Sequence, residues 1–190
     1  YKELLNFCTV DLSAFYFDIR KDSLYCDSKN SEKRKSCIIV LNIILESLLK
    51  WFAPILSFTT EEIFRLISEN KKSIHLENFI KFPKSFENKK LNQKWIELKK
   101  IKDICNISIE AKRASKEIGS SLEAKLTIGL NEEKIRSIKN IDFAELCITS
   151  EARIEKVDTN EINVKTEKAE GNKCPICWKI SKYECKRHNN

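Results

Sequence analysis

Residues 37–58 read CIIVLNIILESLLKWFAPILSF, a long apolar run that decides how the first part of the chain folds. A run of this length has to be weighed as a membrane span. Asn42, Glu46 and Lys50 interrupt it, however, and Glu46 and Lys50 have the spacing of an i,i+4 ion pair on a helix surface. Pro54 lacks a backbone N–H and disfavours helical geometry before it. We therefore predict a helix buried within a bundle and ending at Pro54, with no membrane partner.

The residues on either side of this run also have helical spacing. Toward the N-terminus, steps of three and four residues place seven apolar side chains on one stripe of a helix: Leu4, Leu5, Cys8, Leu12, Phe15, Tyr16 and Ile19. Toward the C-terminus, the sequence Thr59-Thr60-Glu61-Glu62 has the spacing of a capping box. This spacing predicts a helix with Thr59 as its N-cap and Glu62 as the residue that reaches back.

A connection and a long helix are predicted next. Residues 70–90 are polar, rich in lysine and broken by Pro83, which is typical of a connection. An amphipathic helix over about residues 88–118 then stops near Gly119. Its apolar positions are Trp95, Leu98, Ile101, Ile104, Cys105 and Ile109.

After Gly119 the pattern changes to short runs with partial alternation. Four such runs are expected to be strands or strand fragments: Leu122, residues 125–128, residues 146–149 and residues 162–165. A charged helix over about residues 131–140 lies between the first strands. The predicted fold class is thus mainly α: a helical bundle, a long helix, a small α+β unit and a C-terminal tail, divided at residues 1–86, 87–170 and 171–190.

Composition bounds the function. The chain has 190 residues, 42% of them hydrophobic, with three Gly and three Pro. So few turn residues argue against a β-sandwich or barrel. No GxGxxG or GxxxxGK[ST] motif occurs, which argues against dinucleotide and P-loop chemistry. Since the chain contains no Met, we expect it to be a piece of a longer protein or a processed product.

The positive charge is concentrated in two zones. Residues 71–125 carry 14 basic and 7 acidic side chains, and residues 171–190 carry 5 and 1. Residues 1–70 and 126–170 are each slightly acidic. Two basic zones with neutral stretches between them favour contact with an extended polyanion. A solvated lysine surface without a partner is the alternative.

The strongest chemical signal is in the tail, which reads Cys174-Pro-Ile-Cys177-Trp178 and then Cys185-Lys186-Arg187-His188. Two close pairs of sulfur and nitrogen ligands are the usual donors of a tetrahedral zinc site. Because all four positions would be filled by protein, the spacing predicts a structural zinc rather than a catalytic one. A disulfide pair or unligated thiols are the alternatives. The remaining cysteines have no ligand spacing and are predicted to be buried thiols in a reducing compartment.

Trp178 follows the second cysteine and is surrounded by Lys179, Lys182, Lys186 and Arg187. An aromatic ring held by a metal site among basic residues is suited to stacking an unpaired base. In the alternative, Trp178 packs under the metal site as its core residue. The spacing alone does not separate these two roles.

Four blocks in the chain resemble the anticodon-binding domain and C-terminal region of bacterial-type isoleucyl-tRNA synthetases. They are residues 7–25 (FCTVDLSAFYFDIRKDSLY), 53–63 (APILSFTTEEI), 107–113 (ISIEAKR) and 118–124 (IGSSLEA). The expected strand at residues 146–150 and the Cys-x2-Cys-Trp tail follow in the family's order. The Leu-Ser-Ala-Phe-Tyr and Lys-Asp-x-Leu-Tyr pair favours isoleucine over the valine and leucine relatives.

The resemblance implies that residues 1–86 are an anticodon-binding bundle whose first helices are missing, residues 87–170 a junction unit and residues 171–190 a zinc knuckle. It implies a cytoplasmic, monomeric parent enzyme that attaches isoleucine to its tRNA, using ATP and Mg. The family's catalytic and editing domains are not in this chain, so we expect it to recognise tRNA and to catalyse nothing alone. The expected partner is the anticodon stem-loop of isoleucine tRNA, with no DNA partner. A zinc-containing helical protein-interaction module is the alternative.

The resemblance also assigns residues in the tail. It implies that Cys174, Cys177, Cys185 and His188 bind zinc, with His188 in place of the family's usual fourth cysteine. Trp178 matches the tryptophan that helps read the wobble base. Ile176 departs from the arginine that the family has before the second cysteine, so we expect Arg187 or Lys186 to make the substitute contact. Lys179 is a further expected tRNA contact.

Overall fold

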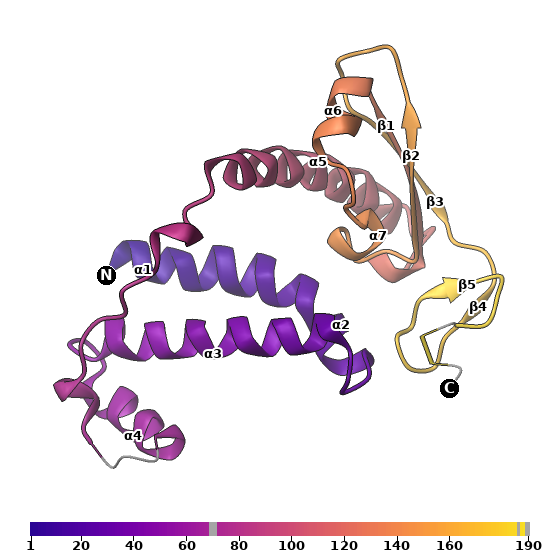
Figure 1. Cartoon of the computed structure of the whole chain (residues 1–190). Helices are drawn as coiled ribbons and strands as arrows, with labels where there is room; N and C mark the ends of the chain where they lie inside the picture. Colours follow the sequence, from indigo (N-terminus) through magenta and orange to yellow (C-terminus); the bar gives the residue numbers. More distant parts are fainter. Residues whose placement is uncertain (69–71, 186, 189–190) are drawn as a thin grey trace. The chain divides into compact units, whose positions relative to one another are not determined.

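The computed structural model describes residues 1–68, 72–185 and 187–188. By its internal contacts the chain forms two compact units. One consists of residues 1–22 together with residues 88–190, and the other of residues 23–87. Each unit is considered by itself, and Figure 1 shows the elements of both.

The chain begins with three consecutive helical segments: α1 (Lys2–Asn6), a π-helix η1 (Phe7–Phe17) and α2 (Asp18–Cys26). The predicted helix is confirmed, but its period is not, because η1 has the i→i+5 bonding of a π-helix over 11 residues. Of the seven stripe residues only Leu12 and Ile19 are buried. Ile19 belongs to the main core, and Phe15 meets Trp95 edge-on with ring centroids 6.0 Å apart.

The apolar run lies in α3 (Glu32–Phe52), which ends just before Pro54, as predicted, but begins five residues before the run, with Ser31 as its N-cap. The predicted burial of this helix is wrong for much of its surface, because Ile38, Ile39 and Val40 are exposed. No helix in the described residues is both long enough and apolar enough to cross a membrane. Lys50 and Glu46 form the expected ion pair, with Nζ and Oε1 2.8 Å apart. Leu49 and Ala53 are buried in a small core with Ile74.

The predicted capping box is wrong. Helix α4 (Ser57–Ile67) begins two residues before Thr59. Its N-cap is Leu56, and no side chain caps the helix. The chain turns back at once after α3, so the first α4 hydrogen bond already runs from the Thr60 N–H to the Leu56 carbonyl, at 2.9 Å. Glu61, rather than Glu62, accepts a hydrogen bond from a backbone N–H. The donor is Ile74, 2.9 Å away, at the start of the 3₁₀ turn η2 (Ile74–Leu76).

The expected connection holds only η2 and a second 3₁₀ turn, η3 (Lys84–Phe86), in its described part. The long helix α5 (Lys89–Ala114) then begins at N-cap Asn88 and ends five residues before Gly119. Lys116 has a φ of 60°, and the Glu117 N–H bonds the Lys112 carbonyl at 3.1 Å. This is a Schellman ending, which usually uses glycine and is therefore hard to place from sequence.

A three-stranded sheet packs on α5 (Figure 1), with strand order β2-β1-β3. The central strand β1 (Ala124–Leu130) pairs parallel with β2 (Glu151–Lys156) and antiparallel with β3 (Asn163–Lys168). Helices α6 (Glu132–Ser137) and α7 (Phe143–Leu146) lie on the crossover from β1 to β2. The core contains Leu98, Ile101, Cys105 and Ile109 of α5 and Leu126, Ile128 and Leu130 of β1.

The strand predicted at residues 146–149 is wrong. Phe143, Leu146 and Cys147 are buried at helical spacing, and Asp142 caps α7 by accepting from the Glu145 N–H at 3.1 Å. Helical burial and the cap outweigh the β-propensity of Ile148 and Thr149. The coarse prediction of a mainly helical chain with a small sheet is confirmed.

Candidate metal centre

The tail is a short two-stranded ribbon that carries two turns. Strands β4 (Asn172–Lys173) and β5 (Ile180–Ser181) pair antiparallel. Gly171, which precedes β4, has a φ of +123°, and a Cβ there would lie 2.1 Å from the Ser181 carbonyl oxygen. Only glycine allows this close approach.

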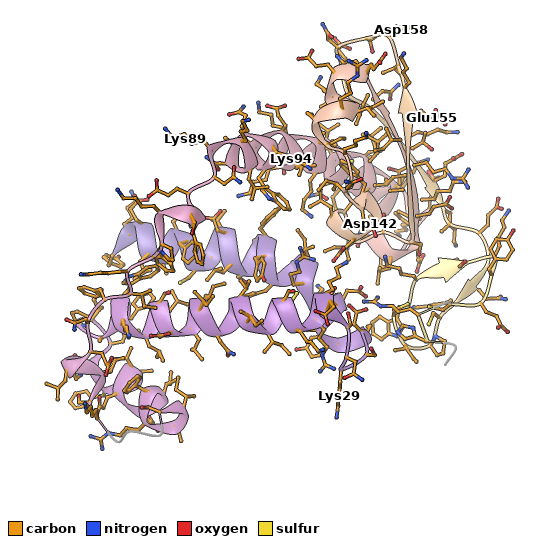
Figure 2. All side chains as sticks on the ribbon, in the orientation of Figure 1. Lys29, Lys89, Lys94, Asp142, Glu155 and Asp158 are labelled. Atoms are coloured by element: carbon orange, nitrogen blue, oxygen red, sulfur yellow. The ribbon has the colours of Figure 1, made fainter. Side chains whose placement is uncertain are left out.

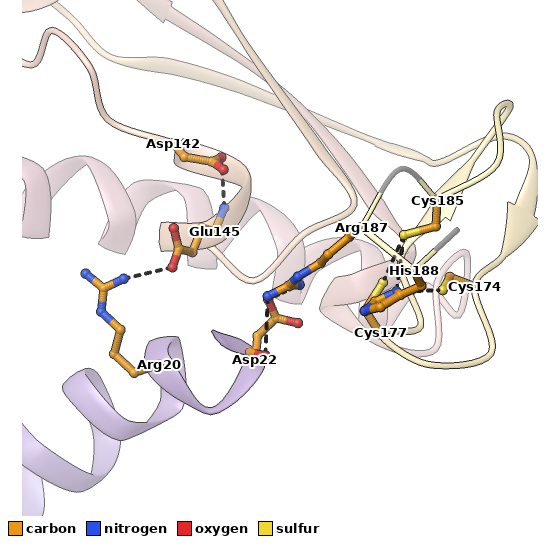
Figure 3. Close-up of polar contacts among 9 residues, drawn as sticks. All are labelled: Arg20, Asp22, Asp142, Glu145, Cys174, Cys177, Cys185, Arg187 and His188. Carbon is orange, nitrogen blue, oxygen red and sulfur yellow. Dashed lines mark hydrogen bonds and ion pairs between the residues drawn. The ribbon is translucent and has the colours of Figure 1, made fainter. Parts of the chain in front are cut away.

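Each turn contributes two candidate ligands. In the first, the Trp178 N–H bonds the Cys174 carbonyl at 3.0 Å and the Cys174 N–H bonds the Lys179 carbonyl at 2.9 Å. In the second, the His188 N–H bonds the Cys185 carbonyl at 3.0 Å. Figure 3 shows the four side chains converging from these turns.

The four donor atoms have the spacing of a tetrahedral site. All lie within 4.8 Å of one another. The Cys177 and Cys185 sulfurs are 3.9 Å apart, and His188 Nδ1 is 3.4 Å from the Cys174 sulfur and 3.3 Å from that of Cys185. Ligands about 2.3 Å from a tetrahedral zinc are about 3.8 Å apart, whereas a disulfide has about 2.05 Å. The donor set therefore fits a metal ion, and all eight cysteines are free thiols.

The two thiols of the first turn have different proton affinities. The N–H groups of Cys177 and Ile176 lower the pKa of Cys174 to about 6. Burial raises the pKa of Cys177 to about 11. A thiolate at Cys174 is thus favoured by the backbone, while ionisation of Cys177 calls for a nearby cation.

Trp178 is displayed on the surface beside this cluster. Its φ is 63° and its side chain is 58% exposed, so packing under the metal site is excluded. Lys173 Nζ lies 5.2 Å from the centre of the Trp178 ring, within cation–π range. Lys179 is half-buried in the same turn, whereas Lys186 lies outside the described residues.

Arg187 has a partner that sequence reasoning missed. Its Nη1 donates to Asp22 Oδ2 at 2.7 Å, and its Nη2 donates to the Asp22 carbonyl at 3.4 Å (Figure 3). Asp22 lies on α2, 165 positions earlier in the chain. No sequence signal connects the two residues, because each is an ordinary charged residue in a polar stretch.

The basic zone on α5 is extensively paired with acceptors. Lys99 Nζ bonds Asp11 at 3.1 Å, Lys100 bonds Glu97 at 2.9 Å, and Lys112 bonds Glu117 at 2.7 Å. Figure 2 shows Lys89 and Lys94 near the start of this helix. Lys89 is exposed, whereas Lys94 donates to the Lys139 carbonyl at 3.0 Å. Local ion pairs thus neutralise part of the positive charge that the sequence suggests for binding a polyanion.

Residues 1–128 match the protein family described as the anticodon-binding domain of tRNA ligase. The chain belongs to this family. Over its full length it is 72% identical to the isoleucine–tRNA ligase of Pelagibacter ubique, of which it covers 21%. It is 38% identical to those of Bartonella henselae and Gluconobacter oxydans, over 95% of the chain and 20% and 19% of the relatives. The chain thus spans about a fifth of the length of these relatives.

The match to the anticodon-binding family and the metal centre occupy different parts of the chain. The match takes in the helices α1 to α5 and most of β1. The Cys174–His188 cluster lies beyond it, in a segment that the relative from Pelagibacter covers as well. The family membership therefore rests on the helical part, and the metal centre stands on its own geometry.

Proposed function

We propose that this chain is the anticodon-reading part of an isoleucine–tRNA ligase and that its partner is the anticodon stem-loop of isoleucine tRNA. The proposal rests on the anticodon-binding family and on the names of relatives that cover nearly all of the chain. The observation that carries the reading role is an exposed tryptophan on the same turn as two metal-ligand cysteines.

In this proposal Cys174, Cys177, Cys185 and His188 hold a structural zinc, forming the knuckle of residues 171–190. The ion supplies folding free energy that the tail lacks otherwise, because few of its side chains are buried. With four protein ligands no position is open for substrate. The protein itself fixes the conformation of the two turns and keeps Trp178 exposed on the first of them.

Trp178 stacks on an unpaired anticodon base, and nearby cations bind phosphate. Stacking on an exposed aromatic ring stabilises a single-stranded base by about 1–3 kcal/mol. Lys179, Lys186 and Arg187 are the proposed tRNA contacts beside it. Arg187 is bonded to Asp22, so it attracts phosphate through its positive charge while its side chain stays in that ion pair.

The parent enzyme supplies the chemistry. Attachment of isoleucine to tRNA, with ATP and Mg, belongs to parts of the enzyme outside these 190 residues, and this chain is non-catalytic. We propose a cytoplasmic monomer, with residues 1–86 as the anticodon-binding bundle and residues 87–170 as the junction unit.

The test is a titration of the zinc-loaded chain with isoleucine tRNA and with an anticodon-swapped copy, at two salt concentrations. We expect tighter binding to the isoleucine anticodon, weakening with salt. Trp178→Leu should weaken cognate binding roughly 5- to 150-fold, which corresponds to about 1–3 kcal/mol, whereas Trp178→Phe should retain most of it. Tyr183→Leu, which removes an 81% exposed ring from the same tail, is the control.

Two results would contradict the proposal. Equal affinity for both anticodons would remove the reading role. Equal losses in Trp178→Leu and Tyr183→Leu would mean that the ring at residue 178 has no special part. In that case the second candidate, a zinc-containing protein-interaction module, is favoured by the exposed apolar side chains Phe58 and Leu66 of α4.

A further inference from the structure

Besides the chain connection from β3, hydrogen bonds of the described residues hold the tail to the rest of its unit near β5 and near its second turn. At the β5 end, the Ile180 N–H donates to Ser150 Oγ at 2.6 Å, and Ser150 Oγ donates to the Leu122 carbonyl. Ser150 directly precedes β2, and its own N–H bonds the Ala124 carbonyl at 3.1 Å. This serine therefore ties the ribbon to the edge of the sheet.

The second attachment is the Arg187–Asp22 pair at the tip. Arg187 lies between two candidate ligands, Cys185 and His188, so its position is coupled to the metal cluster. Its side chain is 26% exposed and that of Asp22 is 21% exposed. The guanidinium reaches both the carboxylate and the backbone carbonyl of Asp22, which fixes its direction as well as its distance.

A segment held near one end can still swing about that end, and each contact at a distance from it restricts the swing. The chain connection from β3 and the Ser150 bond both hold the tail at its β4–β5 end, whereas the Arg187–Asp22 pair holds its second turn. Because Trp178 and the four candidate ligands lie in the same tail, a contact at the second turn restricts the direction in which Trp178 points.

We propose that Asp22 is a positioning residue for anticodon reading: through Arg187 it sets the orientation of the zinc-bound tail, and thereby of Trp178, without touching RNA itself. This inference rests on the proposed function for the reading step. The orientation of the tail is measurable without tRNA, so the two proposals can fail separately.

The orientation is tested by residual dipolar couplings of backbone amides in the zinc-loaded chain. Amides of β1–β3 and of residues 172–181 should fit one alignment tensor in the unmodified chain and need two in Asp22→Ala. The matched control is Arg20→Gln, which breaks another ion pair of α2, Arg20–Glu145 at 2.8 Å, away from the tail. It should keep one tensor. A single tensor in Asp22→Ala overturns the proposal.

The reading step is tested by the ratio of dissociation constants for the anticodon-swapped and isoleucine tRNAs. In Asp22→Ala this ratio should fall about two- to fivefold, the range for a partly exposed ion pair. Zinc content and the salt dependence should stay unchanged. The conservative variant Asp22→Glu, which keeps the carboxylate, should retain most of the ratio, and Arg20→Gln should not change it.

A tRNA contact by Arg187 that does not depend on Asp22 would give a different pattern. If Asp22→Ala behaves like the unmodified chain while Arg187→Ala lowers affinity and reduces the salt slope by about 1, Arg187 contacts phosphate without being positioned by Asp22, and the positioning role of Asp22 is overturned. If the unmodified chain does not distinguish the two anticodons but its tensors split in Asp22→Ala, the proposed function fails and the orienting role of Asp22 stands.

Discussion

The α5–sheet core and the candidate metal-binding tail belong to one unit but differ in what they bury. The core buries Leu98, Leu126 and Ile128 completely. In the described part of the tail, Cys174 and Cys177 are the buried apolar residues, and the surrounding side chains are mostly exposed. Removal of apolar surface from water stabilises the core, whereas the tail offers four candidate metal ligands and a few polar contacts. On the proposed function, the two regions therefore have independent sources of stability, which can be tested by perturbing each in turn.

The largest expected effect comes from removing the metal. Chelation, or Cys185→Ser, should abolish protection of the tail amides from hydrogen exchange while α5 and the sheet stay protected. Structural zinc contributes about 10–16 kcal/mol of apparent binding free energy in small domains, so no other change should disturb the tail as strongly. Zinc content and exchange measured by mass spectrometry are the readouts.

Cys8→Ser is the matched control for this prediction, because Cys8 is a half-buried thiol outside the cluster. It should keep one zinc per chain. Full zinc content in Cys185→Ser, or equal loss of protection in both regions on chelation, would show that the two sources of stability are not independent.

The opposite perturbation should affect the core and spare the tail. Leu98→Ala removes a side chain with no exposed surface and should lower the free energy of unfolding by about 2–5 kcal/mol. Leu91→Ala, on the same helix but 49% exposed, should change it by about 0.5 kcal/mol or less. Denaturant unfolding of the zinc-saturated variants measures both. A change of zinc affinity in folded Leu98→Ala would show that the core and the tail are not stabilised independently.

The smallest effect concerns residues 23–87, which have a smaller core and no candidate metal cluster in their described part. Donation from the Ile74 N–H, with further bonds from Arg65 and Ser73, holds the pKa of Glu61 below its ordinary value of 4.5. A lowered carboxylate pKa stabilises the fold above pH 4.5, and the stabilisation is lost as the pH falls through the folded value. Glu61→Gln should therefore weaken protection of the Ile74 amide at pH 7.

The difference between Glu61→Gln and the unmodified chain should shrink as the pH is lowered through the carboxyl range. Glu62→Gln is the control, because Glu62 is the exposed neighbour that the sequence assigned to a capping box. Its protection should match that of the unmodified chain at every pH. An effect of Glu62→Gln equal to that of Glu61→Gln would contradict the assignment of the Ile74 N–H bond to Glu61.

Sequence analysis succeeded for several local patterns: the spacing of the Cys-x2-Cys and Cys-x2-His pairs, the α5 apolar positions and the break at Pro54. A local pattern alone was not sufficient, because the capping box at Thr59–Glu62 is not formed. Sequence analysis also failed where tertiary packing decides the outcome, as in α7, where burial of Phe143 and Leu146 outweighs β-propensity. The Asp22–Arg187 pair is the extreme case, since no local rule connects residues 165 positions apart.

That separation has a consequence for biosynthesis. Residues 23–87 leave the ribosome as a complete unit, whereas residues 1–22 must wait for α5 and then for the tail. At about 5–20 residues per second, Asp22 waits on the order of ten seconds for Arg187. Ile19 is buried earlier than this, since it packs in the core that α5 and the sheet form. During translation the helix that carries Asp22 is therefore in place before the tail that it orients.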